Sequence, residues 1–130
     1  MSKGPLIRIL GALRNEPWAI RASALDEMIR LAERREVEIE AMRLIVLKAA
    51  KAMDLLGNRE ARVWVSMAKA MVPERTCQII DQAIQMHGAT GISQWTPLAD
   101  LYADVRHLRF ADGPDEVHYM VVGRDELGRH

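Results

Sequence analysis

The chain has 130 residues, 49% of them hydrophobic, which is enough for one domain with a single core. Its 18 basic and 18 acidic residues cancel, which argues against a nucleic-acid-binding protein because such proteins show a basic excess. No apolar run is long enough to cross a membrane, and a single cysteine excludes an internal disulfide. We therefore expect a cytoplasmic protein with neither a nucleic-acid nor a membrane partner.

Residues 1–21 are interpreted as a variable N-terminal segment and residues 22–130 as a helical domain. The apolar residues near the start of the chain fit a short helix or a strand, and the run is too short to decide between them. They are Leu6, Ile7, Ile9, Leu10 and Leu13. Pro17 then marks a break.

The stretch from Ala22 to Leu56 contains no Pro or Gly, and its apolar residues recur at helical spacing. This pattern predicts one long helix, or two helices with a joint that the sequence does not reveal. From Leu44 to Leu47 the apolar surface is wider than one stripe, so we expect this part to be buried on several sides. Gly57 is typical of a helix C-cap.

A second helical pattern begins after Asn58 and continues to Met86. Pro73 lies inside it, and proline in a helix interior predicts a kink or a division into two helices. Gly88 and Gly91 should end this helix, because glycine permits a positive φ.

Two shorter helices follow. Pro97 is expected at the start of the first, and Asp112 is expected to act as the N-cap of the second, ahead of Pro114. No strand pattern appears from residue 22 onward. The sequence therefore predicts an all-α, up-and-down bundle of about four helices.

Three motifs carry a family resemblance. Residues 83–91 read Ala-Ile-Gln-Met-His-Gly-Ala-Thr-Gly, residues 111–118 read Ala-Asp-Gly-Pro-Asp-Glu-Val-His, and residues 121–124 read Val-Val-Gly-Arg. With these motifs, the chain from about Glu38 to Leu127 resembles the C-terminal helical domain of acyl-CoA dehydrogenases. Residues 1–35 do not share the resemblance.

The resemblance implies a chemistry for one carboxylate. Enzymes of this family bind FAD and remove two hydrogens from an acyl-CoA, with a carboxylate taking the α-proton while a hydride passes to the flavin. Asp112 stands at the position of that carboxylate and is one methylene shorter than the usual Glu. The acyl-CoA that would be the substrate is not indicated.

The resemblance also implies cofactor contacts. In the family, the glutamine and glycine of the turn touch the adenosine half of an FAD that is bound to a neighbouring subunit, and residues after the acid touch its adenine. The matching candidates here are Gln85, Gly88, Ala89, Gly113 and Glu116. Ala89 replaces the second glycine of the family turn. No histidine or cysteine has metal-ligand spacing, so we expect no metal site.

The family enzymes also have an N-terminal helical domain and a β-domain, and neither fits in 130 residues. We therefore expect a truncated domain that binds no FAD by itself, is inactive alone and acts as an oligomerising helical module, a dimer or a tetramer. In that case the helix cap is the working role of Asp112. One alternative is a piece of a complete dehydrogenase that uses Asp112 and is completed by the missing domains. Another is a non-catalytic module that binds a nucleotide or CoA.

Overall fold

The computed structural model describes the backbone of residues 18–130, and the side chains from residue 26 onward except those of 27 and 28. The described elements are helix α2 (Trp18–His87), the 3-10 helix η1 (Gly88–Ile92), helix α3 (Leu98–His107) and helix α4 (Asp115–Gly128). There is no strand within this range, which confirms the predicted all-α fold. The apolar residues of the start, Leu6 to Leu13, and the break at Pro17 lie outside the described residues.

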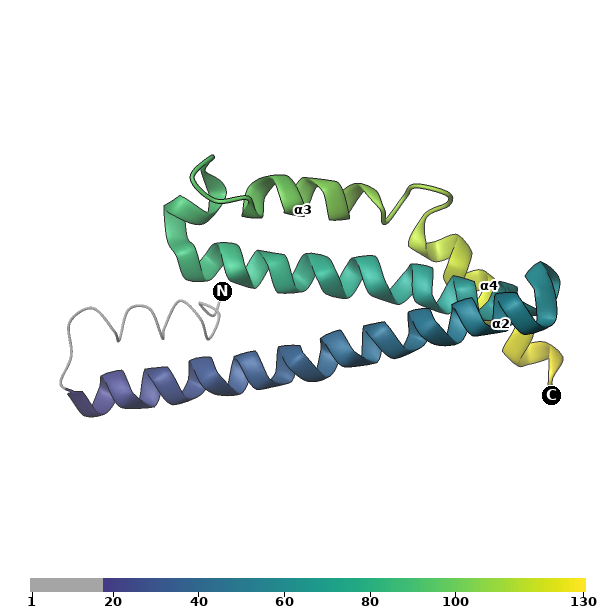
Figure 1. Cartoon of the computed structure of the whole chain (residues 1–130), viewed down its shortest axis with the longest axis horizontal. Coiled ribbons are helices and arrows are strands. Elements are labelled where there is room, and N and C mark those ends of the chain that lie inside the picture. The colour runs from purple at the N-terminus through teal and green to yellow at the C-terminus, as the bar shows by residue number, and fades with distance from the viewer. Residues whose placement is uncertain (1–17) are drawn as a thin grey trace.

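Helix α2 folds back on itself at Gly57, whose φ of 76° and ψ of 175° interrupt the helical backbone. It therefore consists of two antiparallel limbs, a first limb of residues 18–56 and a second limb of residues 58–87 (Figure 1). With α3 and α4, the two limbs make the expected count of about four helices. The positive φ confirms the role predicted for Gly57, because glycine adopts this conformation without a steric penalty.

The first limb is helical without interruption from Trp18 to the turn, as its lack of Pro and Gly predicts. The expected boundary between residues 21 and 22 thus falls inside a helix, and the division into a segment and a domain stays a prediction. In the second limb, Pro73 is buried and its backbone is helical, so this proline does not divide the limb.

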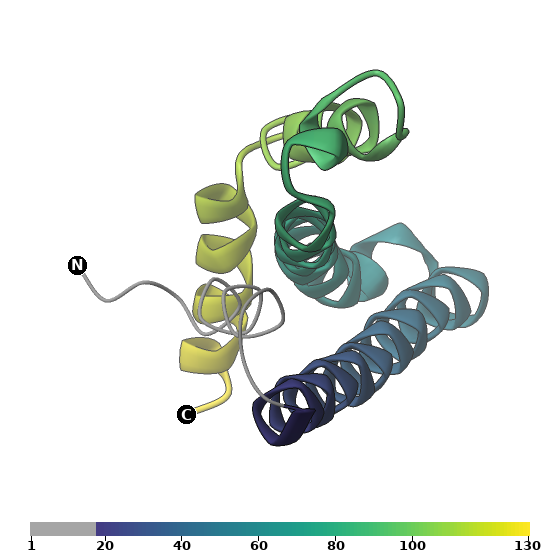
Figure 2. The same ribbon diagram turned by 90° about the vertical axis from the view of Figure 1, so that its left-hand side faces the viewer.

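The second limb lies at the centre of the molecule, with the first limb, α3 and α4 arranged around it (Figure 2). α3 runs alongside the second limb, and α4 crosses near the turn at Gly57 (Figure 1). Most of the buried apolar residues are small. They are Met42, Ala49, Ala52, Ala61, Ala70 and Cys77.

The expectation that residues 44–47 are buried on several sides is wrong for the single chain. Leu44 is 54% exposed and Leu47 is 51% exposed. The physical reason is that, among residues 18–130, the first limb packs against the second limb, and its remaining faces have no neighbour within that range (Figure 2).

Candidate functional site

The turn after the second limb presents three of the expected cofactor contacts at the surface. Gln85, Gly88 and Ala89 are all exposed, and Gly88 has a φ of 60°. Nothing lies within 4 Å of the place where a side chain of Gly88 would stand. The turn therefore offers an open surface, and the residues present do not enclose a flavin.

Gly91 sets the shape of this turn by close packing. It is buried, and a Cβ atom at this position would lie 2.6 Å from the carbonyl oxygen of Ile84. The hydroxyl of Thr96 donates hydrogen bonds to the carbonyl oxygens of Thr90 (3.4 Å) and Gly91 (3.3 Å). Gly91 is thus required for contact with the helix rather than for a positive φ, which only Gly88 adopts here.

Asp112, the expected base, lies in the connection between α3 and α4. Its φ is 55°, and it is the only non-glycine residue with a positive φ in the described chain. Gly113 beside it also has a positive φ, of 105°. Asp112 is exposed, Gly113 is half-buried, and Glu116 is exposed in the first turn of α4.

The predicted N-cap role of Asp112 is wrong. α4 begins at Asp115 with Pro114 at its N-cap, and no side chain caps it by a hydrogen bond. The left-handed backbone of Asp112 and the turn at Gly113 precede the helix, so the Asp112 carboxylate does not reach the free N–H groups of its first turn. The exposed carboxylate of Asp112 is therefore not used in holding this helix end together.

Lys69 of the second limb anchors the connection that carries Asp112. Its ammonium group donates hydrogen bonds to the carbonyl oxygens of Leu108 (2.5 Å) and Gly113 (3.3 Å). These two carbonyls lie at either end of the connection. One cation therefore holds both ends of the segment against the central helix.

Arg109 in this connection binds Asp115, the first residue of α4. Arg109 Nε donates a 2.6 Å hydrogen bond to Asp115 Oδ2, and the Asp115 backbone N–H donates one of 3.1 Å to the Arg109 carbonyl. Asp115 is only 4% exposed, so its charge is almost fully withdrawn from water. The hydrogen bond to Asp115 raises the pKa of Arg109, which keeps the guanidinium charged.

A second polar contact lies beneath Gly113. His118 Nδ1 is 3.3 Å from the hydroxyl of Ser66, which is 3% exposed. A Cβ at Gly113 would lie 3.5 Å from His118 Nε2, so this ring packs against the turn. Asp115 Oδ1 and His118 Nε2 are buried and have no hydrogen-bond partner among the described residues.

The expected site residues form two groups that the chain does not bring together. Gln85, Gly88 and Ala89 lie before α3, and Asp112, Gly113 and Glu116 lie after it, at the opposite end of that helix (Figure 1). Sequence reasoning missed Lys69, because its partners lie far away in the chain. It also missed the pairing of Arg109 with Asp115, although the sequence shows these opposite charges only six residues apart.

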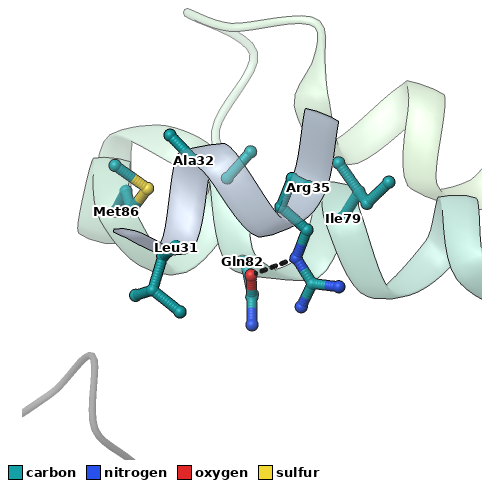
Figure 3. A pocket seen from close by; sticks show the side chains of 7 residues that line it. Leu31, Ala32, Arg35, Ile79, Gln82 and Met86 are labelled. Atoms are coloured by element: carbon teal, nitrogen blue, oxygen red, sulfur yellow. Dashed lines mark hydrogen bonds between the residues drawn. The ribbon is translucent and has the colours of Figure 1, made fainter. Parts of the chain in front are cut away.

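The open ends of the two limbs enclose a separate apolar cleft (Figure 3). Its lining residues are Leu31, Ala32, Arg35, Ile79, Gln82, Ala83 and Met86. Arg35 Nε donates a 2.7 Å hydrogen bond to Gln82 Oε1 across the gap between the limbs. This cleft contains none of the expected site residues.

Two classes of site find no support within residues 18–130. Among the residues whose side chains the structure describes, no group of three His, Cys, Asp or Glu comes close enough together to hold a metal ion. No helix in the same range has the length and apolar character needed to span a membrane.

Comparisons with known proteins agree with one another. The family model described as "Acyl-CoA dehydrogenase, C-terminal domain" matches residues 29–127. Acyl-CoA dehydrogenase family member 11 of Rattus norvegicus is 50% identical over 91 residues, which are 70% of this chain and 12% of the relative. FadE2 of Mycobacterium tuberculosis, named a probable acyl-CoA dehydrogenase, is 52% identical over 92 residues, which are 71% of this chain and 23% of the relative.

A solved structure extends the similarity to the fold. A Mycobacterium abscessus protein assigned as an acyl-CoA dehydrogenase superposes with a TM-score of 0.72 at 36% identity. The match covers 95% of this chain and 30% of that one. The chain thus spans less than a third of the length of each of these three proteins.

Proposed function

The chain belongs to the acyl-CoA dehydrogenase family, and we propose that it acts as an oligomerising helical module that does not dehydrogenate acyl-CoA by itself. The proposal assigns self-association to the first limb. It also assigns no tightly bound FAD to this chain alone, because the turn at Gln85 and Gly88 offers an open surface and no enclosing cavity. A cytoplasmic location is part of the proposal, supported by the free and buried Cys77.

The observation that carries the proposal is the apolar surface of the first limb. Val37 is 71% exposed and Leu55 is 69% exposed, and with Leu44 they follow one line along the helix, because their spacings of seven and eleven residues are near whole turns. Ile39, Val46 and Met53 repeat at seven residues and form a second exposed line.

These two lines flank the buried stripe of Met42, Ala49 and Ala52. A helix that is apolar on three sides is typical of a buried helix, and exposed patches of this kind mark association sites. A second copy of the same limb would bury them in a closed dimer or tetramer, since most soluble oligomers are symmetric.

Sedimentation velocity of the purified chain at micromolar concentration tests the association. We expect a dimer or tetramer, and we expect Leu44→Glu to shift it towards monomer. Ala103→Glu is the matched control, because it adds the same charge at an exposed helical position outside the first limb. A wild-type chain that stays monomeric on concentration would overturn the proposal.

The conformation of Asp112 favours a second candidate function, in which the chain is a working piece of a complete dehydrogenase. A non-glycine residue at positive φ is uncommon and points to a functional hypothesis. In that function the Asp112 carboxylate would take the α-proton of an acyl-CoA, and the other domains would complete the site.

Visible absorbance after gel filtration, followed by an acyl-CoA oxidation assay with an artificial electron acceptor, tests the first function on the chain alone and the second on the chain together with the domains that complete it. If the chain is an oligomerising module, we expect a colourless protein with no turnover above background. Flavin near one equivalent per chain would refute it. Turnover that is lost in Asp112→Asn would establish the second function, because an amide does not accept the proton.

A further inference from the structure

We propose that residues 5–14 of the chain dock into the apolar cleft between the open ends of its own two limbs. None of the residues that line the cleft belongs to the exposed lines that the proposed function uses, and the inference does not depend on that function. It assigns an occupant to a surface that has no neighbour among residues 18–130.

The chemistry of the cleft suits an apolar side chain. Leu31 and Ala32 line it from the first limb, and Ile79, Ala83 and Met86 line it from the second (Figure 3). Its two polar residues, Arg35 and Gln82, are hydrogen-bonded to each other at 2.7 Å. An apolar occupant would therefore cover the cleft without leaving this pair unpartnered, which is the main cost of burying polar groups.

The sequence of residues 5–14 supplies a matching face. Leu6, Ile9, Leu10 and Leu13 recur at spacings of three and four residues, so a helix would present them on one side. Arg8 falls on the opposite side of such a helix, where its charge would stay in water. Pro5 is suited to the first helical position, because it lacks the N–H that would be unpaired there.

The reach of the chain fits this docking. Leu6 and Leu31 lie at nearly equal distances along the sequence from Trp18, where α2 begins. A segment that doubles back at Asn15–Pro17 therefore runs antiparallel to the first limb and brings Leu6 towards the cleft. Met86 lines the cleft beside Leu31 (Figure 3) and is 42% exposed, so it is available for contact with Leu6.

Disulfide trapping in the full chain tests the docking. The background variant is Cys77→Ala, which removes the native thiol, and the test pair is Leu6→Cys with Met86→Cys. A disulfide requires the two Cα atoms to come within about 7 Å of each other. In a glutathione buffer we expect the test pair to close within one chain at least about tenfold faster than the control pair, Arg8→Cys with Met86→Cys.

Equal rates for the two pairs would overturn the proposal. Disulfide-linked dimers in place of closed monomers would overturn it as well, because they would place the segment of a second copy in the cleft. Mass spectrometry under non-reducing conditions distinguishes these products, and circular dichroism of the reduced variants establishes that they are helical.

A labelling experiment gives an independent readout. In the chain whose only thiol is Met86→Cys, we expect Leu10→Asp to raise the rate of alkylation several-fold, because the docked segment no longer shields the thiol. Arg8→Asp is the matched control and should leave the rate unchanged. An alkylation rate that Leu10→Asp does not alter would contradict the docking.

Discussion

The side chain of Arg109 holds the carboxylate of Asp115 at 2.6 Å, and the backbone N–H of Asp115 returns a hydrogen bond to the carbonyl of Arg109. This reciprocal pair closes the connection that carries Asp112. Asp115 is almost fully buried, and Arg109 is the cation that pairs with its carboxylate among the described residues.

Replacing Arg109 with methionine should lower the free energy of unfolding by about 1–3 kcal/mol, because it leaves a buried carboxylate without its partner. Arg106→Met is the matched control, since Arg106 is exposed and lies three residues earlier, in the last turn of α3. Urea unfolding followed by circular dichroism measures both. Equal losses in the two variants would show that the pair contributes nothing specific.

Lys69→Met should release the connection from the second limb. The loss of two hydrogen bonds to backbone carbonyls predicts destabilisation of about 1–3 kcal/mol and faster amide exchange in residues 109–115. Lys51→Met, at an exposed position, should change neither quantity. Unchanged exchange in the Lys69 variant would mean that the ammonium group does not anchor the connection.

The effect of substitutions at Asp112 on stability should depend on its left-handed backbone and not on a helix cap. Asp112→Asn should change stability by less than about 0.5 kcal/mol, since asparagine tolerates the left-handed region. Asp112→Val should cost about 1–2 kcal/mol, because a β-branched residue is strained there. Thermal unfolding of both variants decides this, and an asparagine variant as unstable as the valine variant would contradict the interpretation.

Two glycine-to-alanine substitutions should have opposite signs. Gly91→Ala should destabilise the chain by about 1–3 kcal/mol, because its Cβ would clash with the backbone of Ile84. Gly123→Ala should stabilise it by about 0.5–1 kcal/mol, since Gly123 lies inside α4 with open space around it. Melting temperatures that move in the same direction would refute the packing argument at Gly91.

Because of Cys77, the free energy of unfolding should decrease as the pH rises into the alkaline range. Burial raises the pKa of this thiol above its ordinary value of 9.0, so folding favours the neutral form. The stabilisation by this buried thiol is fully present below the pKa of the thiol in the unfolded chain. It is lost as the pH rises through the pKa of the thiol in the folded chain. Urea midpoints between pH 8 and 10 should therefore fall more steeply for the native chain than for Cys77→Ala; parallel curves would exclude this linkage.

The sequence by itself determined the helical elements and their principal turns. Spacing of apolar residues and the absence of Pro and Gly predicted the first limb, and Gly57 and Gly88 predicted turns that do adopt positive φ. These features depend on residues close together in the chain, so a local pattern is enough to predict them.

The tertiary structure alone decided what holds the candidate site. Asp112 has a local sequence typical of a cap, yet in the folded chain its backbone is left-handed and its carboxylate is exposed. The sequence likewise does not predict the anchoring by Lys69, because the hydrogen-bond partners of Lys69 lie 39 and 44 residues away. The sequence also did not determine the exposure of Leu44. An apolar stripe shows that a helix has a face to bury, but it does not show whether the same chain covers that face.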